Sequence, residues 1–386
     1  MEIAVIGASG AGLPFAAFLL KKHPDWRIHL FDSKEKAGKK VLATGNGHCN
    51  LLNAEAKPSS YSDPSFVESF LNRYSYYEIE KALFSLGIPL LRLGSLAYPK
   101  SFSASGYVET LLSQLKNNVI WHLNTKVVDY AKRQNKWFLR SNNGDFSFDK
   151  LVFACGGKSG KNLGSDGSLF PVFEKHGYHV GDLKPGLCPI RTKENVASLA
   201  GARHEAEVSL LKEGKPVCVE SGEVLFKRDG LSGIVIFNVE REAVHRDALD
   251  LRLDLFPEES LEALSREIEG LLLACPHFGP AFLPAPLFDF ALRAAHLNSL
   301  RNAADAPRFA QALKALDFRI DGFYDFEDSQ VTIGGVSTSQ VSPKNLESKI
   351  EDNVYFLGEV LDVDGPCGGY NLGWCLASAL SLVESL

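Results

Sequence analysis

The sequence lacks the cysteine pairs, long apolar runs and basic excess that define several classes of protein. Its seven cysteines are scattered along 386 residues without a Cys-x-x-Cys pair. This pattern excludes a disulfide framework and indicates reduced thiols, as expected in a cytoplasmic protein. The longest apolar runs, such as Leu13–Leu20 and Leu376–Val383, fall far short of the roughly 20 residues that cross a bilayer. No basic segment precedes the first apolar run, so we expect no signal peptide.

Positive charge is also scarce. The chain has 41 Lys and Arg against 47 Asp and Glu, a formal net charge of -6, and the two signs are interspersed. Nucleic-acid grooves and membrane-surface patches need a basic excess, so we expect neither partner. Only His176 and His179 of the ten histidines lie close together, and we expect no metal site. The length predicts two or three domains.

The first residues contain the strongest motif. An apolar strand, Ile3–Ile6, leads into the glycine-rich turn Gly7–Gly12, and the apolar segment Leu13–Leu20 follows with helical character. A second apolar strand, Ile28–Phe31, ends at Asp32. A strand, a glycine turn, a helix, a strand and an acid in this order form the dinucleotide-binding βαβ unit.

Each part of this unit has a physical role. Gly7 permits the tight turn, and Gly12 permits close packing of the helix on the sheet. The backbone N–H groups of the turn and the positive end of the helix dipole attract a pyrophosphate. Asp32 accepts hydrogen bonds from a ribose and repels a 2′-phosphate. The usual Gly-x-Gly-x-x-Gly pattern is altered, because Ser9 occupies the second glycine position and Gly10 is additional.

Two more apolar strands end in glycines. Leu151–Ala154 runs into Cys155-Gly156-Gly157, and Val354–Leu357 runs into Gly358-Glu359. In an open parallel sheet the carboxyl ends of the strands share one edge, so a long cofactor can lie across all three glycine sites. Glu359 is a second acid at this edge. Gly368-Gly369-Tyr370-Asn371-Leu372 begins the last apolar helix, whose positive end would stabilise negative charge on a reduced flavin.

The middle of the chain has a different character. Short strands are predicted at Glu205–Leu211, Lys215–Glu220, Glu223–Phe226, Ile234–Val239 and Asp250–Leu255, followed by mostly helical sequence to about residue 316. We therefore predict a nucleotide-binding domain in two parts, 1–187 and 331–386, around an insert at 188–330. The insert would have a β subdomain (about 188–256 and 318–330) and a helical subdomain (about 257–317).

Several further segments resemble one bacterial family of NAD(P)/FAD-dependent oxidoreductases, sometimes called BaiN-like. The resembling segments are Lys39–Asn50, Leu151–Lys158, Gly164–Gly167, Gly222–Phe226, Gly230–Gly233, Thr332–Val336, Glu347–Lys349 and Tyr355–Leu372. The last of these, YFLGEVLDVDGPCGGYNL, is the most specific. The resemblance covers essentially the whole chain. It implies an α/β fold, with a discontinuous Rossmann-like FAD-binding domain and an inserted β-barrel-like and helical domain.

The resemblance also implies non-covalent FAD and a small organic substrate between the FAD domain and the insert. Together with the motifs, it predicts cofactor contacts from both ends of the chain. The predicted contact residues are Gly7, Ala8, Ser9, Gly10, Ala11, Gly12, Asp32, Ser33, Lys40, Thr44, Gly45, Asn46, Val127, Ala154, Cys155, Gly156, Gly157, Gly358, Glu359, Gly368, Gly369, Tyr370, Asn371 and Leu372.

The chain departs from the family at His48, where an Arg is usual, in a loop expected near the flavin ring. This exchange replaces a permanent cation by a titratable group, and His48 is the candidate acid or base. The predicted activity is hydride transfer through flavin N5, with NADH or NADPH as the electron donor. Three alternatives stay open: an oxidase that uses molecular oxygen, a non-catalytic flavin or RNA-associated module, and a plain NAD-dependent dehydrogenase. The oligomeric state is not predicted.

Overall fold

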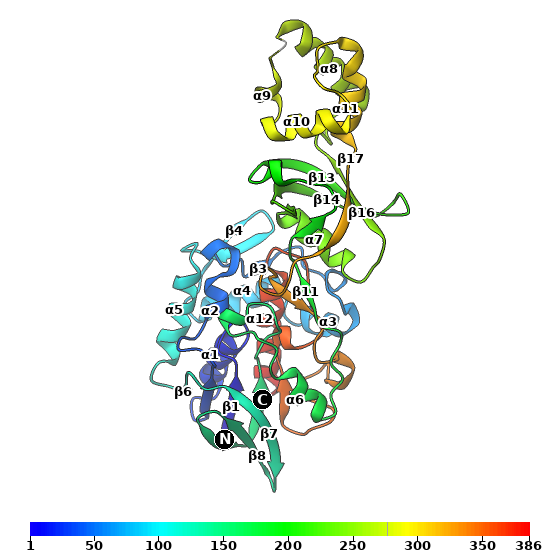
Figure 1. The fold of residues 1–386 in the computed structure, drawn as a ribbon. Helices are drawn as coiled ribbons and strands as arrows, with labels where there is room; N and C mark the ends of the chain where they lie inside the picture. The colour runs from blue at the N-terminus through cyan, green and yellow to red at the C-terminus, as the bar shows by residue number, and fades with distance from the viewer. Residues whose placement is uncertain (276) are drawn as a thin grey trace. The chain divides into compact units, whose positions relative to one another are not determined.

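The computed structural model describes residues 1–275 and 277–386. The chain divides into two compact units, one formed by residues 1–185 with 330–386 and the other by 186–329. Each unit has its own cluster of buried apolar side chains. In Figure 1 the first unit combines the blue and cyan N-terminal half with the red C-terminal segment.

A five-stranded parallel sheet forms the centre of the first unit. Its order is β19 (Val354–Phe356), β10 (Lys150–Phe153), β1 (Glu2–Ile6), β2 (Arg27–Phe31) and β6 (Ile120–His122). Ile6 lies opposite Phe153 on one side and Phe31 on the other, and Phe153 lies opposite Phe356. Four strands therefore end in register, and the segments that follow them share one edge.

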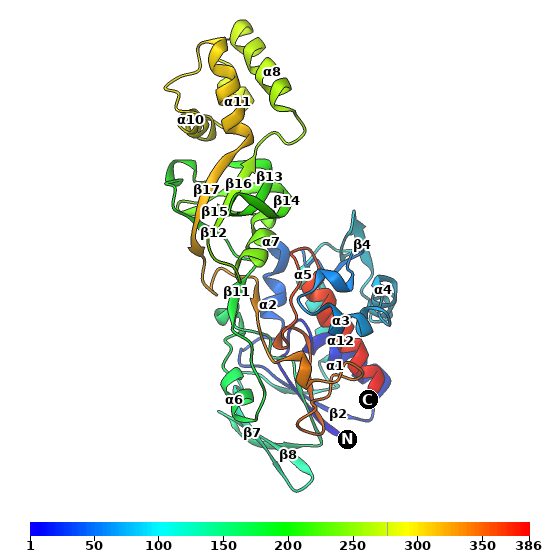
Figure 2. The same cartoon turned by 90° about the vertical axis from the view of Figure 1, so that its right-hand side faces the viewer.

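Two helices from opposite ends of the chain pack together beside this sheet, α1 (Gly12–Lys22) and α12 (Tyr370–Ser385), as Figures 1 and 2 show. Lys22 Nζ donates to the carbonyls of Val383 and Glu384 at 2.8 and 2.9 Å, which satisfies acceptors at the end of α12. Helix α5 (Ala104–Leu115) covers α1. The N- and C-terminal parts of the sequence thus form one core.

Smaller elements complete the first unit. They are the antiparallel sheet β7 (Val127–Arg133), β8 (Lys136–Ser141) and β9 (Gly144–Phe148), the sheet β3 (Leu52–Asn53), β5 (Leu96–Pro99) and β4 (Leu90–Leu93), the paired strands β11 (Lys184–Gly186) and β18 (Val331–Ile333), and the helices α2 (Lys39–Leu42), α3 (Pro64–Leu71), α4 (Tyr76–Ser85) and α6 (Phe170–Lys175). Among the described residues, no helix combines the length and apolar character of a membrane span.

The second unit contains a closed six-stranded barrel and a group of helices. The barrel order is β12 (Ile190–Thr192), β15 (Gly230–Ser232), β14 (Lys215–Phe226), β13 (Arg203–Lys212), β16 (Leu249–Asp254) and β17 (Leu316–Phe323). The helices are α7 (Ile234–Ala243), α8 (Leu261–Ala274), α9 (Gly279–Phe282), α10 (Ala285–Ala294) and α11 (Ala306–Lys314). The predicted fold class, a Rossmann-like sheet with a barrel-like and helical insert, is confirmed.

One predicted strand is wrong. The segment Ile234–Val239 belongs to helix α7. Its β-branched residues favour a strand, but the buried positions, including Val235, Val239 and Ala243, recur every four residues and form one helical face. Packing of this face in the core of the second unit outweighs the local strand propensity.

Candidate functional site

The turn between β1 and α1 is closed by its glycines. Gly7 has a φ of +107°, and a Cβ there would lie 2.3 Å from the carbonyl oxygen of Ala154. A Cβ on Gly12 would lie 1.8 Å from the carbonyl oxygen of Gly7. Neither position accepts a side chain, as the sequence predicted from packing. Gly10 differs, because the nearest atom to a Cβ there is Leu372 Cδ2 at 3.3 Å.

The two ends of the chain meet at this turn. A Cβ on Gly358, after β19, would lie 3.0 Å from Ala11 Cβ and 2.9 Å from Cys375 Sγ of α12. Leu372, in the first turn of α12, is the residue nearest to Gly10. The edge that the sequence assigned to one long cofactor is therefore continuous from the glycine turn to the start of α12.

Asp32 connects β2 to the glycine turn. Its Oδ2 accepts the backbone N–H of Ala8 at 3.1 Å, and its Oδ1 accepts that of Lys34 at 2.9 Å. Burial raises the pKa of this carboxyl group, against the two N–H bonds and the nearby lysines, which lower it. A carboxylate has about four acceptor sites, so two N–H bonds leave capacity for ribose hydroxyls.

Glu359 lies at the centre of the same edge. Its Oε2 accepts from Lys40 Nζ at 2.6 Å, and its Oε1 accepts the N–H of Thr332 at 3.0 Å. A Cβ on Gly157 would lie 2.3 Å from Thr332 Oγ1, so this glycine is required for close approach. The side chains of Lys40 and Glu359 are only 21% and 17% exposed, which limits the screening of their ion pair.

The start of α12 is shaped by a glycine pair. Gly368 and Gly369 have φ values of +111° and +89°, and a Cβ on Gly369 would lie 2.6 Å from the backbone of Leu52. The Asn371 side chain accepts from the N–H of Gly365 at 2.9 Å and donates to its carbonyl at 2.8 Å. The Asn371 side-chain amide is therefore used to close its own loop.

His48 follows an exposed turn in which Gly45 and Asn46 both have left-handed backbone conformations. Its Nδ1 lies 3.1 Å from the carbonyl oxygen of Phe102, and the two rings stack with centroids 4.2 Å apart. A carbonyl oxygen only accepts, so Nδ1 carries a proton. In the neutral imidazole of His48, Nε2 is then the acceptor nitrogen.

Two cysteines at this edge are not reactive thiols. Burial raises the pKa of both Cys49 and Cys155 to about 12, so neither is a thiolate near neutral pH. Cys49 is fully buried. Among the described residues, no group of three or more His, Cys, Asp or Glu side chains is arranged to hold a metal ion.

Comparison with known proteins identifies the family. The model of the HI0933-like protein Rossmann domain family matches residues 1–384. The chain belongs to this family. A curated relative, 3-dehydro-bile acid delta(4,6)-reductase of Clostridium scindens, is 31% identical over 98% of the chain and 97% of its own length. Ribosomal RNA dihydrouridine synthase of Escherichia coli K12 is 28% identical over 99% and 97%.

Solved structures share the fold. The 3-ketosteroid delta1-dehydrogenase of Sterolibacterium denitrificans superposes with a TM-score of 0.51 at 9% identity, covering 100% of this chain and 99% of that chain. The E. coli quinol fumarate reductase FrdA gives a TM-score of 0.50 at 13% identity, over 100% and 70% of the two chains. The chain is thus an FAD-dependent oxidoreductase of the HI0933-like family, as the BaiN-like resemblance predicted.

The residues of this HI0933-like chain fit FAD at the shared edge. The hydroxyl groups of Ser9 and Ser165 are buried and have no hydrogen-bond partner among the described residues. Ser9 lies in the glycine turn, and Ser165 Oγ lies 3.0 Å from where a Cβ on Gly156 would be. Buried hydroxyls without partners are rare, and a phosphate or ribose oxygen would satisfy them.

The other predicted contact residues lie as follows. Ala8, Ala11, Val127 and Ala154 are buried, Ser33 follows Asp32, and Thr44 donates to the carbonyl of Val41 at 2.6 Å. Sequence reasoning missed Thr332 as a site residue. Its Oγ1 accepts the N–H groups of Lys158 and Ser159 at 2.7 and 3.0 Å, which fixes the loop after β10. The Thr-x-Gly-Gly-Val motif contained this signal.

Proposed function

We propose that this protein reduces a carbon–carbon double bond conjugated to a carbonyl group in a small organic molecule, with NADH or NADPH as the electron donor. The observation that carries the proposal is the continuous edge from the glycine turn to α12, in a chain related over its whole length to a bile acid reductase. The names of the reductase and of the dihydrouridine synthase both describe reduction of such a bond.

Bound FAD supplies the two-electron hydride chemistry. Asp32 would hold the ribose, and the backbone N–H groups of Gly7–Gly12 would hold the pyrophosphate. Glu359, oriented by Lys40 and Thr332, accepts from the ribityl chain. The first turn of α12 stabilises negative charge on the ring through its dipole. These residues orient and stabilise, and none of them acts as a nucleophile.

His48 manages the proton in this proposal. Reduction adds a hydride to the carbon distant from the carbonyl and a proton to the adjacent carbon. Protonated His48 donates that proton from Nε2, while its Nδ1–H stays bonded to the Phe102 carbonyl. The imidazole then takes up a proton from solvent before the next turnover. An Arg, usual at this position in the family, would not release a proton near neutral pH.

The charge of the second unit favours a small molecule over RNA. Residues 186–329 contain 16 Lys and Arg against 24 Asp and Glu, a formal net charge of -8. RNA binding depends on neutralising phosphates with basic side chains. The net negative charge of this unit instead repels phosphate groups. The dihydrouridine synthase activity named for the E. coli relative is therefore the second candidate, not the first.

Anaerobic absorbance measurements test the proposal. The flavin band should bleach with NADH or NADPH and return on addition of a cyclic enone, but not of the matched saturated ketone. Recovery only with oxygen would identify an oxidase, and recovery only with uridine-containing RNA, with a salt-sensitive mobility shift, would identify the RNA enzyme. Either result contradicts the proposed substrate class.

A further inference from the structure

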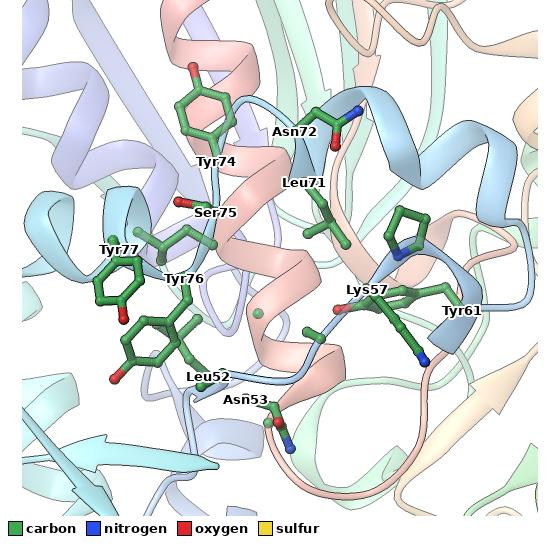
Figure 3. Close-up of a pocket in the computed structure, with 16 residues that line it drawn as sticks. Leu52, Asn53, Lys57, Tyr61, Leu71, Asn72, Tyr74, Ser75, Tyr76 and Tyr77 are labelled. Atoms are coloured by element: carbon green, nitrogen blue, oxygen red, sulfur yellow. The ribbon is translucent and has the colours of Figure 1, made fainter.

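The first unit contains a cavity of about 280 Å³ that no step above uses. Its walls come from β3 and the segment that follows it, from the α3–α4 connection, and from Gly369 and Gly373 of α12. Figure 3 shows Tyr61 and Lys57 on one side, Tyr76 and Tyr77 on the opposite side, and Leu71 and Asn72 above Leu52 and Asn53. The volume is just below the ~300–1,000 Å³ of pockets for drug-sized ligands, which leaves room for a single ring.

The lining combines aromatic and apolar side chains with the polar side chains of Asn53, Asn72 and Ser75. Tyr61, Tyr74, Tyr76 and Tyr77 line the cavity together with Leu52, Leu71, Pro58 and Ile79. The Tyr61 and Tyr74 hydroxyls already donate to the carbonyls of Tyr370 and Leu380. The Tyr76 hydroxyl is buried without a hydrogen-bond partner among the described residues. Aromatic walls favour a flat ring, and the polar side chains in the lining favour a polar substituent on it.

Charge determines what that substituent is. Among the described residues that line the cavity, Lys57 is the only charged one, and no Asp or Glu lines it. This is unusual in a chain whose acids outnumber its bases by 47 to 41. Because no protein carboxylate in the lining competes for the Lys57 ammonium group, the cavity favours an anionic ligand. A carboxylate group on the ligand can accept a charge-assisted hydrogen bond from Lys57.

The cavity adjoins the dinucleotide edge at Gly369, the residue before α12, but extends along a different face of the helix. Gly373 lines the cavity, whereas Leu372 and Cys375 contact Gly10 and Gly358 from another face. At 3.6 residues per turn the two faces are about 100° apart. Both faces belong to the same first turns of α12, so a ligand in the cavity contacts the helix that faces the cofactor.

We propose that this cavity binds a small carboxylate carrying one ring, of about the size of benzoate. The ring lies between the tyrosines and over Gly373, where the absence of a side chain leaves space. The carboxylate bonds to Lys57. This is a second ligand site of the enzyme, and it borders the segment that we assign to the flavin ring at Gly369.

Fluorine NMR tests this site, with 4-fluorobenzoate added to the FAD-bound protein in the absence of any electron donor. The neutral isostere 4-fluorobenzamide is the ligand control. Saturable binding of the acid is expected, with the amide weaker. Lys57→Gln should weaken the acid about fivefold and leave the amide unchanged, since a partly exposed ion pair contributes modestly. Lys81→Gln, the same charge change on an exposed lysine outside the lining, should have no effect.

Two filling variants keep the test decisive if one fails to fold. Gly373→Leu fills the cavity from α12, and Ala56→Phe fills it from the opposite wall; each should abolish binding of 4-fluorobenzoate. The proposal would be overturned if 4-fluorobenzoate still bound to either folded filling variant. Equal affinities of Lys57→Gln and Lys81→Gln, or binding that never saturates, would also overturn it. Each readout is binding alone, so the substrate class proposed above stands or fails separately.

Discussion

At the scale of single residues, space explains which glycines of the turn are required. Gly12→Ala places a Cβ 1.8 Å from the Gly7 carbonyl oxygen, whereas Gly10→Ala meets nothing closer than 3.3 Å. We expect Gly12→Ala to lower the free energy of unfolding by about 3 kcal/mol or more and Gly10→Ala to change it by less than about 1 kcal/mol. Urea unfolding of the apoproteins measures both, and equal values would contradict the packing argument.

Gly10 has a different role, because a Cβ there meets only side-chain atoms, at 3.3 Å or more, and we place the pyrophosphate beside its backbone. Gly10→Val should leave the apoprotein folded and remove the flavin by blocking backbone approach. The ratio of FAD to protein after purification, with circular dichroism as the control for folding, measures this. A Gly10→Val protein that retains a normal flavin spectrum would be incompatible with the position we assign to the pyrophosphate.

His48 is the residue with the clearest chemical expectation. His48→Gln should retain FAD and lower kcat by about 10²-fold or more, as loss of a general acid does. His48→Arg should also retain FAD but lose the histidine-dependent limb of the pH profile. Nitrogen-15 NMR should show Nδ1 protonated in neutral His48. Because the backbone carbonyl of residue 102 sets this tautomer, Phe102→Tyr and Phe102→Gly should both keep Nδ1 protonated. Nε2 protonation in neutral His48 of the parent protein would refute the positioning.

At the scale of elements, the pairing of β2 with β6 predicts a dependence of stability on pH. His29 Nδ1 and His122 Nε2 are 3.0 Å apart on these adjacent strands. Burial, with a smaller contribution from His122, lowers the pKa of His29 to about 4. Burial also lowers the pKa of His122. The unfolded chain therefore binds more protons than the folded protein between pH 6.5 and about 4, so stability falls as pH falls through this window.

The measurement is urea unfolding at pH 7 and pH 5. The parent protein should lose about 1 kcal/mol more between these pH values than His29→Gln, after allowance for the partial exposure of the pair. His179→Gln, an exposed histidine outside the sheet, is the matched control and should behave like the parent. An identical pH dependence in all three proteins would show that folding does not lower the pKa of His29.

The elements also show where sequence reasoning succeeded. Strands β1, β2, β10 and β19 were predictable because each is an apolar run that ends at a glycine or an acid. Helix α7 was not, because the β-branched run Ile234–Ile236 favours a strand until its four-residue burial pattern is considered. The contact of His48 with Phe102 joins residues 54 positions apart, and no local pattern predicts it.

At the scale of the whole molecule, the cofactor edge belongs to the first unit alone. Among the described residues, the buried core cluster of that unit has no member between Tyr178 and Val336. The strands at which the chain leaves and re-enters the unit, β11 and β18, are paired with each other. Replacing residues 187–329 by a short Gly-Ser linker should give a folded protein that binds FAD within about tenfold of the parent affinity. Equilibrium titration measures this, and a folded but FAD-free product would show that the second unit supplies essential contacts.

The cavity beside α12 also emerges only at this scale, because its walls come from residues 52–79 and 369–373. The second segment belongs to the motif that we assign to the cofactor, and neither segment alone indicates a further ligand. The predicted cofactor contacts were accessible from sequence because glycines and acids at strand ends have few other uses. A cavity, in contrast, depends on the size of side chains that come from distant segments and pack together only in the folded protein.

The central claim is that one FAD molecule extends from the glycine turn near the N-terminus to the first turn of α12 near the C-terminus. A crystal structure of the FAD-bound protein tests it most directly. We expect the pyrophosphate at the backbone N–H groups of Gly7–Gly12 and the ring edge at Gly368–Leu372. Density for FAD at any other place, or for a nucleotide that reaches only one of these two segments, would contradict the account.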